Sequence, residues 1–219
     1  MSATRKSAAA KAGRKRPAAA LPNEVRIVGG AWKRSKLRVL DRPGLRPTPD
    51  RVRETLYNWL GQRLDGWRCL DAFAGSGALG FEAASRGAAE VVLLERDGAL
   101  FAELGAARER LGAAQVRVER ADAVAWMSRA DPRRFDLVLL DPPFGDAGLF
   151  ERVLAAAAPL VAVGGFLYFE GPAACPGETF AALGLHLHRD GCAGAVHFHL
   201  ARRGAAAGAD DGGEIPSPR

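Results

Sequence analysis

The sequence lacks the features that mark disulfide-rich, zinc-thiolate and membrane-spanning proteins. Only three of its 219 residues are cysteine, at positions 69, 175 and 192, and no two form a CxxC pair. This spacing predicts neither a disulfide framework nor a metal site, and we expect a reducing, cytoplasmic location. The longest uncharged run, residues 153–169, contains one proline and a Gly-Gly pair, so it predicts no membrane span. The amino-terminal residues also lack the apolar stretch of a signal peptide.

Acidic residues are scarce in the first quarter of the chain. Residues 1–53 hold 15 Lys and Arg against three acidic residues, a net charge of +12. Residues 54–219 hold 16 Lys and Arg against 22 acidic residues, a net charge of −6. A basic amino-terminal segment followed by a mildly acidic remainder indicates a polyanionic partner for residues 1–53. The alternative is that the basic residues only make the chain more soluble.

The composition divides the chain into four segments. Residues 1–22 contain no acidic residue and no sustained hydrophobic period, and they are predicted to be a disordered basic tail, with an organelle transit peptide as the alternative. Residues 204–219 are rich in Gly, Ala and Asp and are also predicted to be disordered. Between the tails we expect an amino-terminal extension at 23–66 and a main domain at 67–203.

Local patterns predict an α/β fold. Residues 25–28 and 36–39 predict a small hairpin, and Thr48-Pro49-Asp50 predicts a helix start, with Thr48 as the cap and Pro49 in the first helical position. Nearly continuous apolar strands are expected at 69–73, 91–95, 116–119, 135–140 and 166–170, and helices at 79–85, 96–111, 124–130 and 149–158. Residues 185–189 and 195–201 predict a terminal hairpin. Together they predict a mostly parallel seven-stranded sheet covered by helices on both faces.

A glycine-rich segment, DAFAGSGALG at 71–80, directly follows the first main-domain strand. It contains the pattern GxGxxG from Gly75, and Glu95 follows 20 residues later, where a carboxylate can bind ribose hydroxyls. This arrangement fits a nicotinamide or flavin dinucleotide. The Asp71 carboxylate would repel a pyrophosphate, however, and favours a cationic ligand such as S-adenosylmethionine (SAM). A tight turn that binds no ligand is the remaining alternative.

A second motif, DPPF at 141–144, ends the strand predicted at 135–140. Its two prolines fix φ and remove two N–H donors, so the loop is stiff. It presents a carboxylate, open carbonyl groups and an aromatic ring at the sheet edge where α/β proteins bind ligands. A strand-ending turn with two prolines by chance is the alternative.

These motifs resemble those of a known enzyme family. DPPF resembles the (Asp/Asn)-Pro-Pro-(Tyr/Phe) motif of Rossmann-like class I methyltransferases that methylate amino nitrogens, and DAFAGSG resembles their cofactor loop. The segments VRIVGG at 25–30 and LRPTPDRVRETLYNWL at 45–60 closely resemble the bacterial 16S rRNA (guanine-N2)-methyltransferases. The resemblance runs from about residue 25 to residue 171. It implies SAM-dependent methylation of a guanine N2 amine in 16S rRNA of the small ribosomal subunit or its assembly intermediate. We expect the protein to be a monomer.

The resemblance also implies roles for individual residues. The implied catalytic residues are Asp141, Pro142, Pro143 and Phe144. The implied cofactor contacts are Asp71, Phe73, Gly75, Ser76, Gly77, Glu95, Arg96, Asp122 and Ala123. Positive charge near the amino terminus suggests RNA contacts at Lys33, Arg34, Lys36, Arg46, Arg51 and Arg53, of which the last three are ambiguous between RNA and cofactor.

Several other functions share parts of this pattern. An amino-group methyltransferase acting on DNA adenine or protein glutamine would use the same motif. A dinucleotide-dependent oxidoreductase or a non-catalytic RNA-binding module would belong to other classes. The presence of Asp71, Glu95, Asp122 and the whole of DPPF in one chain favours the catalytic methyltransferase.

All four histidines lie in the predicted terminal hairpin. An antiparallel register that pairs His186 with His199 also pairs His188 with His197 on the same face. This register predicts a polar outer face, and a four-histidine metal site is the less favoured alternative.

Deleting residues 1–22 is expected to weaken RNA binding without affecting SAM. The deletion removes six Lys and Arg and no acidic residue, so the slope of log K against log salt should become shallower by up to ~0.7–0.9 per lost phosphate contact. Filter-binding salt titrations on small-subunit particles measure this slope. Changing Lys33, Arg34 and Lys36 to Glu should weaken binding further, because a folded hairpin loses less entropy on binding than a disordered tail. An unchanged slope after truncation would show that the tail makes no phosphate contacts.

Overall fold

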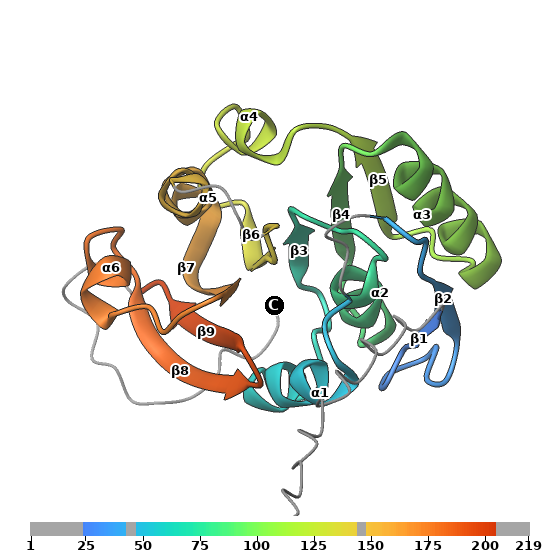
Figure 1. The fold of residues 1–219 in the computed structure, drawn as a ribbon, viewed down its shortest axis with the longest axis horizontal. Helices are drawn as coiled ribbons and strands as arrows, with labels where there is room; N and C mark the ends of the chain where they lie inside the picture. The colour runs from blue at the N-terminus through green and yellow to red at the C-terminus, as the bar shows by residue number, and fades with distance from the viewer. Residues whose placement is uncertain (1–23, 43–46, 144–147, 205–219) are drawn as a thin grey trace, which may run out of the picture.

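The computed structural model describes residues 24–42, 47–143 and 148–204 (Figure 1). The strands are β1 (Glu24–Arg26), β2 (Lys36–Arg38), β3 (Arg68–Asp71), β4 (Glu90–Glu95), β5 (Val116–Arg120), β6 (Phe135–Leu140), β7 (Val161–Gly171), β8 (His186–Ala193) and β9 (Val196–Arg202). The helices are α1 (Asp50–Trp59), α2 (Ala78–Ser85), α3 (Gly98–Leu111), α4 (Ala123–Met127), α5 (Leu149–Ala157) and α6 (Gly177–Ala181), with a 3-10 turn at Ala158–Leu160. The predicted tails, 1–22 and 204–219, lie outside the described residues except for residue 204.

The main sheet has the predicted α/β architecture. Its seven strands run in the order β5-β4-β3-β6-β7-β9-β8, and β1 and β2 form a separate antiparallel pair. Strands β3 to β7 pair in parallel, whereas β9 pairs antiparallel with both β7 and β8. The sequence prediction of a mostly parallel seven-stranded sheet with an antiparallel terminal hairpin is therefore confirmed.

Each central strand contributes side chains to two hydrophobic layers. Successive strand residues point to opposite faces of a sheet, so Cys69, Val91 and Leu137 belong to one core while Leu70 and Val92 belong to the other. The first core also contains residues of β1, β2, α1, α2 and α3. The second contains residues of α4, α5 and α6. The nearly continuous apolar strands thus follow from burial on both faces. Figure 1 shows α1, α2 and α3 on one side of the sheet and α4, α5 and α6 on the other.

The order of the strands creates a crevice beside β3. The chain passes from β3 to β4 and β5 on one side, then returns to β6 on the other side of β3. Loops that leave the carboxyl ends of β3 and β6 consequently diverge in opposite directions. Ligands of open α/β sheets bind in this kind of crevice, which here lies between the glycine-rich segment and DPPF.

Two helix starts differ from the sequence predictions. Helix α1 begins at Asp50 with Pro49 as its N-cap residue, and no side chain caps it, so the expected capping role of Thr48 is wrong. Helix α3 begins at Gly98 rather than residue 96, because the Asp97 side chain accepts the N–H groups of Ala99 and Leu100. Helix α6 was not predicted.

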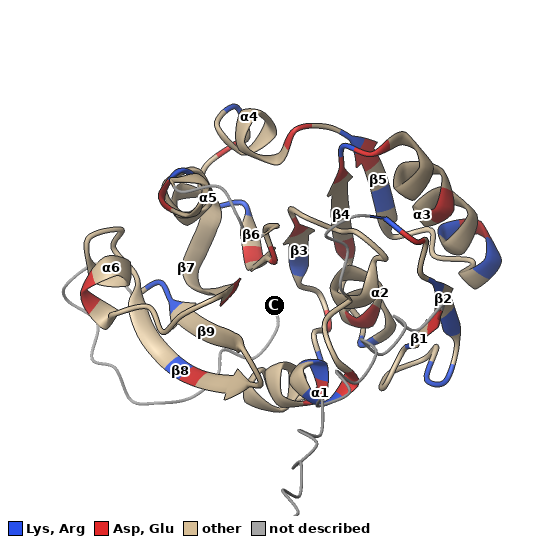
Figure 2. Cartoon of the chain, viewed as in Figure 1, with Lys and Arg blue, Asp and Glu red and all other residues tan. Residues whose placement is uncertain are grey.

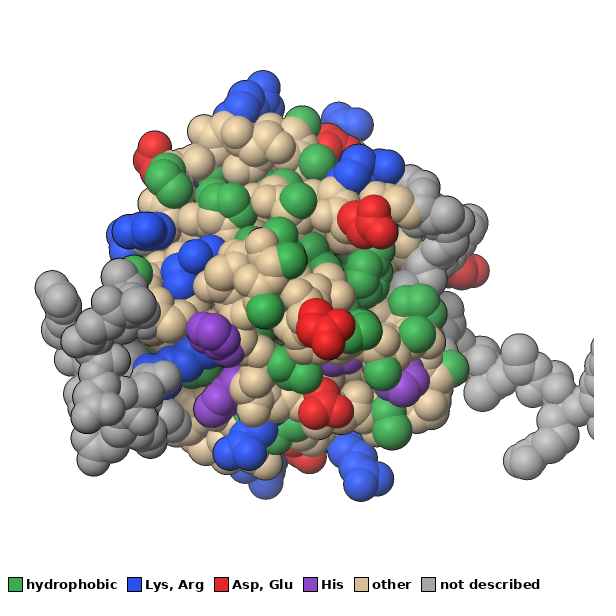
Figure 3. All heavy atoms as spheres, turned by 90° about the vertical axis from the view of Figure 1, so that its left-hand side faces the viewer, with side chains coloured by type: hydrophobic (Ala, Val, Ile, Leu, Met, Phe, Trp, Pro, Cys, Tyr) green, Lys and Arg blue, Asp and Glu red, His purple; other side chains and the backbone are tan. Residues whose placement is uncertain are grey.

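The terminal hairpin has a different register from the one that pairs the histidines. Its turn is Gly194-Ala195, with Gly194 at φ +62°, and a shift interrupts the β8–β9 ladder between Leu187 and Arg189. His199 consequently faces Asp190, and His197 faces Cys192. The predicted histidine pairing is therefore wrong, because it needs a turn two residues nearer the amino terminus. Figure 3 shows histidine side chains at separate places on this face rather than in one cluster, although some of them lie near one another.

A buried ion-pair cluster joins the amino-terminal extension to the main sheet. Glu82 of α2 is 0% exposed, and its Oε2 accepts the Val28 N–H at 2.7 Å and an Arg53 N–H at 3.1 Å. Its Oε1 lies 2.9 Å from the guanidinium of Arg86. Nearby, the Ser85 hydroxyl donates to the Gly29 carbonyl at 2.6 Å. These contacts fix the segment that follows β1 against the end of α2.

Replacing Glu82 with glutamine is expected to destabilise the protein by about 3–5 kcal/mol. The change leaves the buried Arg86 guanidinium without its counter-charge and leaves Arg53 paired only with the half-exposed Asp50, and removing one partner is the costly way to break a buried ion pair. Urea unfolding measures the effect.

Glu103→Gln is the matched control for this prediction. The Glu103 carboxylate lies 3.8 Å from the guanidinium of Arg38, which is mostly exposed. Loss of this ion pair should therefore lower the free energy of unfolding by no more than about 1 kcal/mol. Equal unfolding free energies for the two variants would contradict a structural role of the Glu82 cluster.

Candidate active site

A cleft of about 1100 Å³ opens at the carboxyl ends of β3, β4 and β6. Seven of the nine residues predicted to contact a cofactor line it, namely Phe73, Gly75, Ser76, Glu95, Arg96, Asp122 and Ala123. Asp141, Pro142 and Pro143 of DPPF line the same cleft, while Phe144 lies outside the described residues. The fold therefore brings the two predicted motifs together around one space.

Glu95 shapes the part of the cleft beneath the glycine-rich segment. One carboxylate oxygen accepts the Gly75 N–H at 3.0 Å, and the other accepts the Asp97 N–H at 2.8 Å. The side chain thus joins the loop after β3 to the start of α3. A half-buried carboxylate in this position can also accept hydrogen bonds from hydroxyl groups of a ligand.

Asp122 is both a helix cap and a residue of the cleft wall. It precedes α4, and its Oδ1 accepts the Ala125 N–H at 2.9 Å. Its exposed carboxylate lines the cleft just after β5, the strand that pairs in parallel with the Glu95 strand β4. This position suits an acceptor for a ligand amino group.

Asp71 lies beneath the glycine-rich segment and is not among the residues that line the cleft, so its direct contact with a cofactor stays a prediction. The side chain is 1% exposed and its Oδ2 accepts the Gly80 N–H at 2.9 Å, which places it beneath the glycine-rich segment. Burial raises the pKa of Asp71 from 3.8 to about 7, an effect that the Gly80 N–H only partly offsets. The carboxyl group instead holds the start of α2 against β3.

Gly77 and Gly80 serve packing more than ligand contact. Gly77 has φ +78°, and a Cβ there would lie 2.6 Å from the Phe81 ring. A Cβ on Gly80 would lie 2.1 Å from a methyl group of Leu93 in β4. Only glycine fits these two positions. Gly77 is predicted to contact the cofactor, but it is not among the residues that line the cleft.

Asp141 belongs to a cluster of polar side chains at one end of the cleft. The Thr48 hydroxyl lies 3.3 Å from Asp141 Oδ2 and 3.0 Å from Glu170 Oε1. The Tyr168 hydroxyl donates to the same Glu170 oxygen at 2.9 Å. Burial, together with the nearby Glu170 and Asp71, raises the pKa of Asp141 well above its usual range. Higher pH therefore favours the ionised, hydrogen-bond-accepting form of Asp141.

Sequence analysis missed Thr48 and Glu170 as site residues. Thr48 precedes α1 and was assigned to capping, while Glu170 simply ends an apolar strand. Glu170 follows the run FLYF in β7, and a carboxylate that closes a buried strand next to the DPPF strand is the signal that indicates its place.

The cleft carries more negative than positive side chains. Among the described residues, five carboxylates line it, from Glu95, Asp97, Asp122, Asp141 and Glu170, against the guanidinium groups of Arg42, Arg96 and Arg152. Arg42 lies 3.7 Å from Asp97. An acid-rich wall repels a pyrophosphate and favours a ligand that carries ammonium and sulfonium charges. The residues present therefore fit SAM better than a dinucleotide.

Most of the predicted RNA contacts lie on the surface. Lys33, Arg34, Lys36 and Arg51 are exposed, and Arg46 lies outside the described residues. Figure 2 shows Lys and Arg gathered at the β1–β2 turn and at the end of α3. Sequence analysis missed the α3 contribution, where Arg110 donates to the Lys36 carbonyl at 3.0 Å.

Arg53 does not contact RNA, contrary to prediction. It is 0% exposed and donates to Glu82, to Asp50 at 2.6 Å, and to the backbone carbonyls of Arg26 and Thr48. The arginine therefore links β1, α1 and α2, and it fixes the backbone of Thr48 at the cleft.

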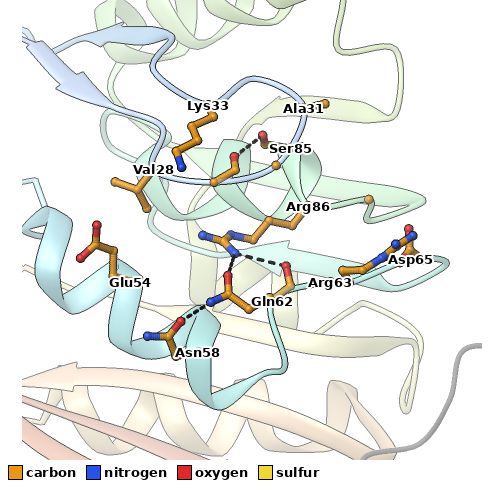
Figure 4. A pocket seen from close by; sticks show the side chains of 13 residues that line it. Val28, Ala31, Lys33, Glu54, Asn58, Gln62, Arg63, Asp65, Ser85 and Arg86 are labelled. Carbon is orange, nitrogen blue, oxygen red and sulfur yellow. Dashed lines mark hydrogen bonds and ion pairs between the residues drawn. The ribbon is translucent and has the colours of Figure 1, made fainter.

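A second cavity of about 730 Å³ lies between the β1–β2 turn and the ends of α1 and α2. Figure 4 shows Arg86 reaching toward Gln62, whose side-chain oxygen accepts at 2.6 Å. Its lining holds three cationic side chains, Lys33, Arg63 and Arg86, and two acidic ones, Glu54 and Asp65. Nothing in this lining points to one class of ligand.

The described residues contain no group of three or more His, Cys, Asp or Glu side chains that could hold a metal ion. Among the same residues, no helix combines the length and apolar character that a membrane span requires.

Comparison with known proteins agrees with the motifs. A family model described as "Conserved hypothetical protein 95" matches residues 25–202. The chain belongs to this family. The ribosomal RNA small subunit methyltransferase D of Escherichia coli (strain K12) is 39% identical over 197 residues, which cover 90% of this chain and 98% of that protein.

A second relative and a solved structure support the same family assignment. The Haemophilus influenzae protein of the same name is 45% identical over 127 residues, or 55% of this chain and 64% of that protein. A solved Escherichia coli protein, described as a candidate methyltransferase, superposes with a TM-score of 0.71 at 35% identity and covers 84% of this chain and 99% of that one. The resemblance inferred from the sequence motifs, and the Rossmann-like methyltransferase fold, are thereby confirmed.

Replacing Asp71 with asparagine is expected to make stability less dependent on pH. Because its pKa rises from 3.8 to about 7 on folding, protonated Asp71 stabilises the fold fully below about pH 4, and this stabilisation is lost as the pH rises through about 7. Between pH 5 and pH 8, the wild-type free energy of unfolding should fall by about 2–3 kcal/mol more than that of Asp71→Asn. Urea unfolding at both pH values measures this, with the exposed Asp131→Asn as control. Identical pH dependence in wild type and Asp71→Asn would contradict the assignment.

Proposed function

We propose that this protein is a SAM-dependent methyltransferase that modifies the exocyclic N2 amine of a guanine in small-subunit ribosomal RNA. The observation that carries the proposal is the single cleft in which the DPPF carboxylate, Asp141, faces the same space as the cofactor-binding residues of β3 and β4. Membership of the family, with full-length similarity to ribosomal RNA small subunit methyltransferase D, supports the substrate class.

The proposed cofactor half of the cleft binds SAM. The backbone of Gly75 and Ser76 faces the methionine portion, and Glu95 accepts the ribose hydroxyls. Asp122 accepts the adenine amino group, and Arg96 covers the adenine ring. When bound, SAM supplies a methyl group on a positively charged sulfur, which is a good leaving group.

The proposed acceptor half of the cleft positions the target amine. A guanine amine is a weak nucleophile because its lone pair is delocalised into the ring. Hydrogen bonds from this amine to Asp141 and to the Pro142 carbonyl turn its lone pair toward the methyl group. Positioning for in-line attack can supply as much as ~7–11 kcal/mol of barrier reduction in favourable cases, and the released proton leaves through Asp141 or water.

The proposed RNA surface is the exposed basic turn between β1 and β2. Its Lys33, Arg34 and Lys36 side chains would contact phosphates, which position a protein on RNA without reading bases. The target base must leave its stack to reach the cleft. We further propose that the protein acts as a cytoplasmic monomer on the small subunit or its assembly intermediate.

Replacing Asp141 with alanine tests the proposal. Methyl transfer from tritiated SAM to small-subunit particles from cells lacking the enzyme should fall by roughly 10²-fold or more, because a transition-state hydrogen-bond acceptor is lost. Calorimetric SAM affinity should stay within a few-fold of wild type, because Asp141 lies outside the cofactor half. Nucleoside analysis of the product should show N2-methylguanosine.

The exposed Asp131→Ala is the matched control and should keep full activity. A parallel loss of SAM affinity and activity in Asp141→Ala would contradict the division of the cleft. Micromolar NAD binding by the wild type without SAM binding would overturn the methyltransferase proposal.

A further inference from the structure

Glu170 is a buried carboxylate at the acceptor end of the cleft, and the methyl-transfer chemistry above does not use it. It lies near the end of β7, which pairs in parallel with the DPPF strand β6. The residue is 3% exposed and yet lines the cleft. Burying a carboxylate is costly unless donors surround it, so its partners and its neighbours in the cleft are informative.

Two hydroxyl groups hold this carboxylate in place. Tyr168 donates to Glu170 Oε1 at 2.9 Å, and the Thr48 hydroxyl lies 3.0 Å from the same oxygen. Burial and the nearby Glu170 raise the pKa of Tyr168 well above its usual range, so this phenol remains a donor. Thr48 is also 3.3 Å from Asp141 Oδ2. One hydroxyl thus sets the spacing between two carboxylates, and Arg53 fixes its backbone.

Two adjacent acceptors match guanine better than adenine. The Watson–Crick edge of guanine presents two neighbouring donors, the N2 amine and N1–H. Adenine presents its N6 amine beside N1, which is an acceptor. Enzymes that extrude a base read it through hydrogen bonds to this edge. A second carboxylate beside Asp141 would accept guanine N1–H and would repel the lone pair of adenine N1.

We propose that Glu170 is the residue that selects guanine, by accepting N1–H while Asp141 accepts the N2 amine. This inference rests on the proposed function and adds the reason for base choice, because DPPF alone is compatible with any amino group. Thr48 and Tyr168 are positioning residues that hold the selecting carboxylate. Selection depends on the negative charge of Glu170, since an amide can rotate to donate instead of accept.

The test compares Glu170→Gln with wild type on two substrates. Small-subunit particles from cells lacking the enzyme carry either guanine or adenine at the position that the wild type methylates. Initial rates with tritiated SAM give kcat/KM for each particle. The wild type should prefer guanine, and this preference should fall by about 10²-fold in Glu170→Gln, the scale of one charged hydrogen bond.

The controls separate base selection from a general loss of structure. Glu178→Gln changes an exposed residue of α6 and should keep the wild-type preference. Calorimetric SAM affinity and the binding constant for the particles should match wild type in Glu170→Gln. An unchanged preference for guanine in a folded Glu170→Gln protein would overturn the proposal.

A second measurement applies even if Glu170→Gln does not fold. Particles reconstituted with 2-aminopurine at the target position keep the 2-amine but present an acceptor at N1. Wild-type transfer to them should be about 10²-fold slower than to guanine, and equal rates would overturn the proposal. Absence of transfer to guanine particles by the wild type would instead overturn the proposed function on which this inference depends.

Discussion

The buried carboxylate of Glu82 is the contact on which the arrangement of the site depends. It binds Arg53 of α1, Arg86 at the end of α2 and the Val28 N–H, and so joins the amino-terminal extension to the main sheet. Arg53 also donates to the Thr48 carbonyl, and the Thr48 hydroxyl lies between Asp141 and Glu170. The acceptor half of the cleft is therefore completed by the segment that contains Thr48, which lies outside the parallel sheet. The position of this segment depends on the Arg53–Glu82 ion pair, which does not line the cleft.

Acidic and basic side chains lie in different parts of the molecule, and each part suits a different ligand. The cleft is acid-rich, which suits a cationic cofactor, whereas Lys and Arg lie on the outer surface around the β1–β2 turn and the end of α3 (Figure 2). An RNA strand that meets this outer surface can be held by phosphates while only one extruded base enters the cleft. This separation keeps the polyanion away from the carboxylates that line the site.

The carboxylates of the cofactor half have structural as well as ligand-facing roles. Glu95 holds the Gly75 N–H, Asp97 caps α3, and Asp122 caps α4. Each is therefore oriented by backbone donors before any ligand arrives, which lowers the cost of organising the site. Substituting any of them would change loop geometry as well as ligand contact.

The sequence alone determined the fold class, the glycine-rich segment and DPPF, because strand burial and backbone conformation impose local patterns that can be counted along the chain. It also indicated Glu95 and Asp122 correctly as cleft residues. Tertiary structure decided whether a charged or polar residue faces the cleft, the core or solvent. Arg53 reads as one of several basic residues near the amino terminus, but the fold buries it on Glu82. Thr48 and Glu170, 122 residues apart, meet only because the fold brings the segment before α1 to the carboxyl end of β7, and no local pattern encodes such a contact.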